Sequence, residues 1–212
     1  MSTRTVALSQ PQHLHFPIGN GEVYYGCDQE WFRTPWQRMA GCGPTVAATQ
    51  ILYLTKAKAL PLPHNVHSKA DCVHLLESVW RHVTPGFKGV HLIEQLSDGV
   101  LAFVKKENVD LSAHLLQVPR SPEERPSLAA VADFITAGLL ADCPVAFLNL
   151  SNGKLHNLDE WHWVTLVGLQ AEEDLGSVQA TMYDGAKQTQ IDLKLWLETT
   201  RLGGGFVYFT AA

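Results

Sequence analysis

A short motif around position 42 fixes where one apolar helix must begin. The sequence Cys42-Gly43-Pro44 leads directly into the largely apolar run 46–54. Proline lacks a backbone N–H, so it is tolerated in the first turn of a helix but not in its interior. Pro44 therefore predicts a helix that begins near Cys42 or Gly43. Because the residues that follow are apolar on nearly every side, we expect this helix to be buried.

The start of that helix gives Cys42 an environment suited to a nucleophile. The first N–H groups of a helix have no partner within it, and together with the helix dipole they favour an anion. A thiol held there is shifted towards the reactive thiolate. Gly41 and Gly43 let backbone or substrate come close to the sulfur. We therefore interpret Cys42 as a candidate nucleophile.

Length and charge limit the classes of protein to which the chain can belong. Its 212 residues, 46% of them hydrophobic, can bury a sizeable core in one domain or at most two lobes. A formal net charge of −5 argues against nucleic acid as the main partner. Residues 1–10 lack the pattern of a signal peptide, and no run of about 18 apolar residues suggests a membrane span. The expected location is cytoplasmic.

The order of the expected elements indicates an α+β fold. Residues 1–20 suggest a loose N-terminal arm before a single domain over 21–212. Expected helices cover 42–54, 68–83, 90–108, 127–139 and 193–201. Expected strands cover 22–26, 111–118, 144–150, 161–169, 178–183 and 205–210. Helices dominate the first two thirds and strands the last third, which predicts a helical side packed on a mostly antiparallel sheet.

A cysteine nucleophile requires a base, and a third group must orient that base. His162 opens an apolar strand and shares a face with Val164 and Leu166. An imidazole among apolar groups needs a partner, although a core histidine bonded to a backbone carbonyl is the alternative. Asp184 ends the next expected strand and is the candidate orienting group, although Asp-Gly is also a common turn. The combination of the three side chains indicates nucleophilic catalysis more strongly than any one alone.

Three short motifs carry these side chains. They are Cys42-Gly43-Pro44-Thr45, His162-Trp163-Val164 and Tyr183-Asp184. Together they resemble the papain-like cysteine peptidases, especially the double-glycine, bacteriocin-processing-like branch. The resemblance implies a papain-like fold over residues 21–212, with Cys42 as nucleophile, His162 as base and Asp184 as orienting residue. The branch frequently has proline after this aspartate, whereas this chain has Gly185.

The resemblance also implies a glutamine upstream of Cys42. Its side-chain amide would join the Cys42 backbone N–H in stabilising an oxyanion. Two residues compete for this role. Gln29 lies near Trp31 in the sequence, as in the branch. Gln37 lies five positions before Cys42, a spacing closer to that in papain. We prefer Gln29.

The resulting hypothesis is a hydrolase that cleaves a peptide, isopeptide or amide bond through a thioester on Cys42. It needs a peptide or small amide substrate and implies no cofactor, no metal, no nucleic acid and no membrane; the oligomeric state stays open. Acyl transfer on the same scaffold and a non-catalytic binding module are the alternatives.

One other segment is rich in side chains that can bind metals. These side chains are His64, His67, Asp71, Cys72 and His74. No HExxH pattern accompanies them, so we interpret them as a solvated helix face rather than a zinc site. The four cysteines of the chain include no C-x-x-C pair, and we expect them to be thiols.

Overall fold

The apolar run after Cys42 forms the central helix of the protein, α2 (Cys42–Ala57). Every residue from 43 to 54 is buried, whereas Cys42 itself is partly exposed. The helix start predicted from Pro44 and the burial predicted from the apolar run are both confirmed.

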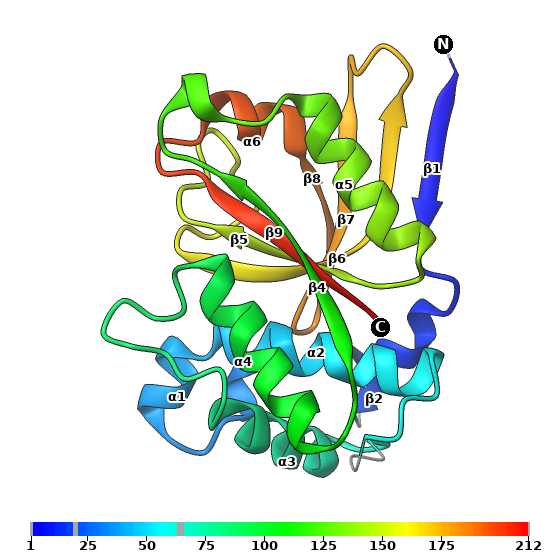
Figure 1. Ribbon diagram of the computed structural model, residues 1–212, viewed down its shortest axis with the longest axis vertical. Helices are drawn as coiled ribbons and strands as arrows, with labels where there is room; N and C mark the ends of the chain where they lie inside the picture. Colours follow the sequence, from blue (N-terminus) through cyan, green and yellow to red (C-terminus); the bar gives the residue numbers. More distant parts are fainter. Residues whose placement is uncertain (1, 19–20, 63–65, 212) are drawn as a thin grey trace.

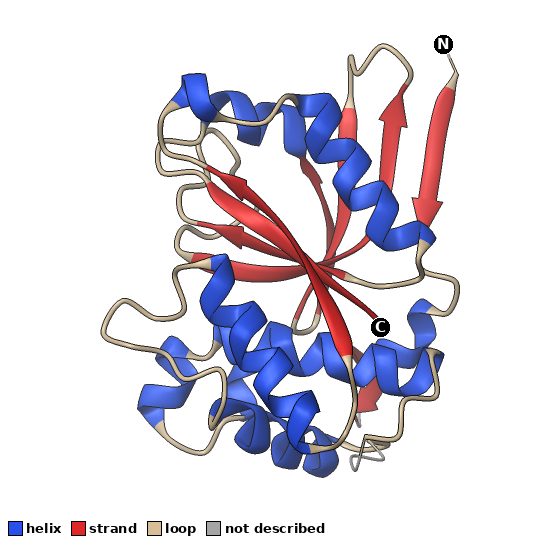
Figure 2. Cartoon of the chain, viewed as in Figure 1, coloured by secondary structure: helices blue, strands red, loops and turns tan. Residues whose placement is uncertain are grey.

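The structure is a computed structural model that describes residues 2–18, 21–62 and 66–211 (Figures 1 and 2). Its other helices are α1 (Pro35–Ala40), α3 (Lys69–Trp80), α4 (Ile93–Lys106), α5 (Leu128–Leu140) and α6 (Leu193–Thr199). Short 3-10 helices are η1 (Pro11–Leu14), η2 (Gln29–Trp31) and η3 (Pro122–Glu124). The strands are β1 (Thr3–Ala7), β2 (His15–Ile18), β3 (Glu22–Tyr25), β4 (Leu111–Val118), β5 (Val145–Asn149), β6 (His162–Glu172), β7 (Val178–Asp184), β8 (Lys187–Asp192) and β9 (Gly204–Ala211).

The strands form one large antiparallel sheet and one small one. Within the described residues, the large sheet has seven strands in the order β4-β9-β5-β6-β7-β8, and β1 pairs with β6. Strands β2 and β3 pair separately. All pairings in both sheets are antiparallel. The predicted mixture of helices with an antiparallel sheet is therefore observed.

Helices cover the large sheet in two groups. In Figure 1, α1 to α4 gather below the strands, whereas α5 and α6 lie above them. Helix α2 packs on β6, and α5 packs on β6 and β1. Apolar side chains from the helices and the sheet form one continuous core. This arrangement brings the start of α2 next to the strand that carries His162.

Local side-chain chemistry explains where α3 and α5 begin. The Ser68 hydroxyl accepts from the Asp71 backbone N–H at 3.2 Å, and the Asp71 carboxylate accepts from the Ser68 N–H at 2.9 Å. This reciprocal capping satisfies N–H groups that the helix itself leaves free. Ser127 caps α5 in a simpler way, accepting from the Ala130 N–H at 3.2 Å. Both helix starts agree with the sequence-based prediction.

The N-terminal segment differs from its prediction. The loose arm expected at residues 1–20 instead contributes β1, which pairs with β6 from Thr3 opposite Glu172 to Ala7 opposite Gly168. It also contributes β2, which pairs with the β3 strand. The described part of this segment is therefore integrated into the sheets, because its backbone groups find partners there.

The cysteines Cys27, Cys42, Cys72 and Cys143 are all free thiols, as predicted. Within residues 2–18, 21–62 and 66–211, no helix combines the length and the apolar character that crossing a bilayer requires.

Candidate active site

The backbone around Cys42 is tightly packed. Gly41 is the N-cap of α2, so Cys42 is the first helical residue and its N–H has no carbonyl partner within that helix. Gly43, the next residue, packs against the loop before α4. A Cβ atom on Gly43 would lie 2.7 Å from the Val90 Cβ atom. Glycine at this position therefore lets the loop approach the start of the helix.

The imidazole and the carboxylate come from neighbouring strands. His162 is the first residue of β6, and Asp184 is the last residue of β7. Thr165 pairs with Tyr183, so His162 and Asp184 project from the same face of the sheet as diagonal neighbours. Their side chains form an ion pair, with 3.0 Å between His162 Nε2 and Asp184 Oδ2.

His162 also contacts the nucleophile. Burial lowers the pKa of the ring, but hydrogen bonds to Asp184 and to Cys42 outweigh burial and raise the pKa to about 10. Because Asp184 occupies Nε2, Nδ1 is the nitrogen left for the thiol. A pKa this high favours the protonated ring at neutral pH, in which Nε2 donates to the Asp184 carboxylate. Cys42, His162 and Asp184 line the same cavity.

The raised pKa of His162 predicts a loss of stability at alkaline pH. A group whose pKa is higher in the folded protein stabilises the fold fully below its unfolded pKa, here about 6.5. This contribution is lost progressively as the pH rises towards the folded value of about 10. We expect the free energy of unfolding in urea to decline between pH 6.5 and 10. The decline should be clearly smaller in His162→Gln, and parallel profiles of the two proteins would contradict the assignment.

A water-sized cavity connects Gln29 with these three side chains. The cavity has a volume of ≈ 20 Å³, and Gln29, Cys42, His162 and Asp184 all line it. Gln29 opens η2, whose start is fixed by Asp28, because the Asp28 carboxylate accepts from the Glu30 N–H at 2.8 Å. An amide donor therefore lies at the same cavity as the sulfur.

Gln37, the competing glutamine, has a different environment. Its side-chain oxygen accepts from the Thr34 N–H at 3.1 Å and from the Thr34 hydroxyl at 3.0 Å, which caps α1. Its NH₂ group donates to Glu77 at 3.0 Å. It is not among the residues that line the Cys42 cavity. Gln29 therefore lies at the cavity that Cys42 lines, whereas the Gln37 side chain is engaged by Thr34 and Glu77.

The turn after Asp184 explains why glycine follows it. Residues 185 and 186 connect β7 to β8, and Gly185 has a φ of +55°. Proline is locked near −65° and could not adopt this conformation. The Gly185 carbonyl accepts from the Tyr25 N–H at 2.8 Å, which ties the turn to the small sheet. This support for Asp184 was not predicted, because nothing in the sequence links Tyr25 to β7.

Asp28 is a second residue that sequence reasoning missed. Burial raises the pKa of its carboxyl, and the negative charges of Glu30 and Asp184 add to this effect. A Cβ atom on Gly185 would lie 2.6 Å from Asp28 Oδ2, so the carboxyl packs directly on the turn after Asp184. The one available signal was the ability of Asp28 to cap the short helix that carries Gln29.

The histidine-rich segment around α3 was the other candidate for a binding site. His64 lies outside the described residues. Asp71 accepts from the backbone of His67 and Ser68 at the start of α3, and Cys72 is buried. Among the described residues, no group of three or more histidine, cysteine, aspartate or glutamate side chains could hold a metal ion.

Comparisons with known proteins agree with the geometry at the level of the fold. No protein-family model and no curated protein sequence matches the chain. Among solved structures, it is similar to the crystal structure of UfSP from C. elegans, with a TM-score of 0.57 and 8% sequence identity over 99% of this chain. The match spans 34% of the UfSP chain. At this identity the likeness concerns the fold alone, and it gives no support to the double-glycine branch.

Proposed function

We propose that this protein is a cysteine hydrolase of papain-like type that cleaves a peptide, isopeptide or amide bond through a thioester on Cys42. The observation that carries the proposal is the position of His162, which pairs with Asp184 at 3.0 Å and lines the same cavity as Cys42. A histidine held in this way can both maintain a thiolate and deliver a proton. The likeness to a cysteine protease fold supports the same conclusion.

The first half of the reaction forms the thioester. The Cys42 sulfur attacks the substrate carbonyl carbon, and the carbonyl oxygen takes up negative charge. The Cys42 backbone N–H and the Gln29 side-chain amide donate to that oxyanion. The tetrahedral intermediate collapses as the carbon–nitrogen bond breaks, and the departing amine takes the proton from His162 Nδ1. Asp184 keeps the ring in the orientation that this transfer requires.

The second half releases the product. The neutral His162 ring accepts a proton from a water molecule as its oxygen attacks the thioester carbonyl. The carbon–sulfur bond then breaks, the carboxylic acid leaves, and the sulfur is again a thiolate next to a protonated imidazole. The ring gives one proton to the amine and takes one from water, so the enzyme ends the cycle in its starting state.

Alkylation of the cysteines tests the proposal without a known substrate. We expect iodoacetamide at pH 6 to modify Cys42 far faster than the three buried cysteines, as read for each site by mass spectrometry. Since burial alone could explain that difference, His162→Ala is the decisive variant. It should slow Cys42 alkylation at pH 6 by roughly 10- to 100-fold, because the nucleophile loses its neighbouring base.

A matched histidine variant serves as the control for this experiment. His156 is exposed and does not line the cavity that contains Cys42. His156→Ala should therefore leave the alkylation rate of Cys42 unchanged. Equal rates in the wild type and His162→Ala between pH 5 and 9 would refute catalysis and favour a binding module.

A further inference from the structure

A second pocket opens on the other side of Cys42, and its walls are apolar. It has a volume of ≈ 220 Å³, and Cys42 lines both this pocket and the small cavity that contains Gln29. Its large side chains are Trp36, Met39, Phe87 and Trp161. The sulfur therefore lies between a polar cavity the size of a water molecule and a larger apolar pocket.

The side chains around this pocket are unusually exposed for their type. Trp36 is 44% exposed, Met39 73%, Phe87 100% and Trp161 45%. Single exposed apolar residues are common on protein surfaces, but a group of them around one concavity marks a binding site. These four come from three separate segments of the chain, so the fold assembles the group.

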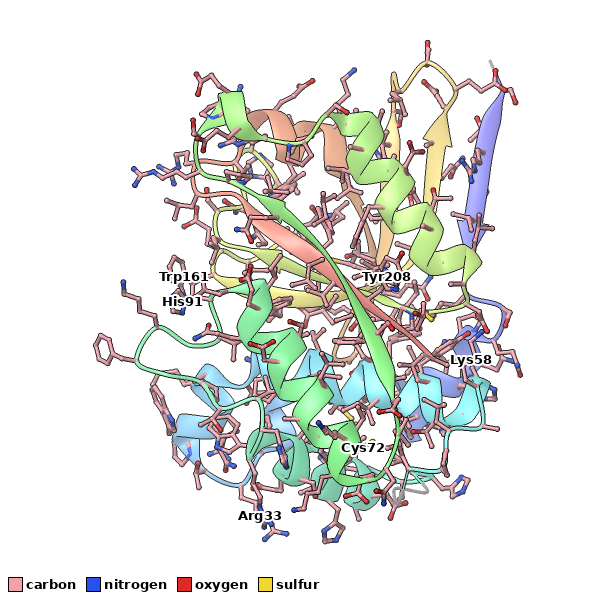
Figure 3. All side chains as sticks on the ribbon, in the orientation of Figure 1. Arg33, Lys58, Cys72, His91, Trp161 and Tyr208 are labelled. Carbon is pink, nitrogen blue, oxygen red and sulfur yellow. The ribbon has the colours of Figure 1, made fainter. Side chains whose placement is uncertain are left out.

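Hydrogen bonds hold one wall of the pocket in place. The Trp161 Nε1–H donates to the Lys88 carbonyl at 2.9 Å, and the Trp161 ring stacks on His91 with 6.5 Å between centroids. Figure 3 shows these two rings side by side. The Trp163 Nε1–H donates to the Val90 carbonyl at 2.7 Å. The two tryptophans that flank His162 therefore fasten the loop that carries Phe87 to β6, so this wall is formed before substrate binds.

We propose that this pocket receives a large apolar side chain, preferably an aromatic one, from a substrate residue that flanks the scissile bond. The inference rests on the proposed function, because it treats Cys42 as the attacking group. A cavity of about 150 Å³ is large enough to bind benzene, so ≈ 220 Å³ accommodates a phenylalanine ring. Aromatic walls also suit an aromatic occupant. A pair of glycines next to the scissile bond would leave the pocket empty.

Two alkylating probes with the same reactive group test the pocket directly. Iodoacetamide and N-benzyl iodoacetamide differ in one phenyl ring. The ratio of their rates at Cys42, benzyl over unsubstituted, should be at least about 10 in the wild type, because the ring leaves water when it enters the pocket. In the double variant Met39→Ala/Phe87→Ala the ratio should fall to near the value for a free thiol. Both side chains are exposed, so the substitutions remove pocket wall without emptying the core.

The control variant is Leu140→Ala, because Leu140 is 67% exposed and lies in α5 rather than at the pocket. It should keep the wild-type ratio. Failure of this inference is distinguishable from failure of the proposed function. The effect of His162→Ala on the rates of both probes tests the proposed function. Only the ratio of the two rates tests the pocket. A wild-type ratio equal to that of a free thiol, or a ratio unchanged in the double variant, would overturn the proposal.

Peptides then test the same inference in turnover. Otherwise identical reporter peptides would carry phenylalanine, glutamate or glycine on either side of the cleaved bond. We expect kcat/KM for the best phenylalanine peptide to exceed that for the glycine peptide by roughly 10- to 100-fold. Cleavage of the glycine or glutamate peptide as fast as the phenylalanine peptide would count against an apolar pocket.

Discussion

Cys42→Ala and His162→Ala should each lower kcat/KM by about 10⁴- to 10⁶-fold, and the double variant should lose no more than the worse single variant. In the proposed mechanism the Cys42 sulfur and the His162 ring act as one unit. Without His162 the sulfur is a poor nucleophile and the leaving amine receives no proton. Without Cys42 no thioester forms, so the ring has no intermediate whose hydrolysis it could assist. Once either side chain is lost, substituting the other therefore causes no further loss of activity.

The measurement is kcat/KM for the best-cleaved peptide of a library, with active-site concentration determined independently. Unfolding midpoints of the four proteins in urea at pH 6 establish that each variant is folded. Losses that multiply in the double variant would mean that the two side chains act independently. In that case the contact between His162 and Cys42 would not be the basis of catalysis.

Gln29→Ala should lower kcat by about 10²- to 10³-fold while KM changes little, and Gln37→Ala should leave kcat nearly unchanged. A donor to the oxyanion acts only when the carbonyl oxygen carries charge, so its loss affects the transition state and not the bound substrate. Gln37 instead caps α1 and donates to Glu77. Its removal should cost about 1–2 kcal/mol of stability.

The two glutamine variants are each other's control. Both replace the same side chain upstream of the nucleophile, and each is assayed for kcat, KM and the free energy of unfolding. The expected result is a crossed pattern, with loss of rate in one variant and loss of stability in the other. A large fall in kcat in Gln37→Ala with full activity in Gln29→Ala would reverse the assignment.

Local chemistry made much of the fold predictable. Pro44 determined the start of α2, and the Ser68–Asp71 pair determined the start of α3. Every helix and strand expected beyond residue 90 is present, with ends that differ by a few residues. The relation between His162 and Asp184 was also accessible, because strand periodicity and chain order predict that adjacent strands bring them together.

The features that sequence reasoning missed depend on tertiary contacts or on weak local patterns. Helix α1 has six residues, too few for a helical period, and it is stabilised by the capping contact between Thr34 and Gln37. Strand β8 is largely polar because it lies at the edge of the sheet, and β1 acquires its partner only from β6. The hydrogen bond between Gln37 and Glu77 could not be predicted, because the two residues are forty positions apart.

The hydrogen bonds of Trp161 and Trp163 have a consequence for how selectivity is expressed in the kinetics. Trp161 precedes β6 and Trp163 is its second residue, so the two flank His162, and both hold the loop that forms a wall of the apolar pocket. A substrate side chain that binds against this wall is therefore coupled, through these hydrogen bonds, to the strand that positions the His162 ring. Binding energy gained in the pocket is then available to align the proton donor with the leaving group. Good and poor substrates would accordingly differ in kcat as well as in KM.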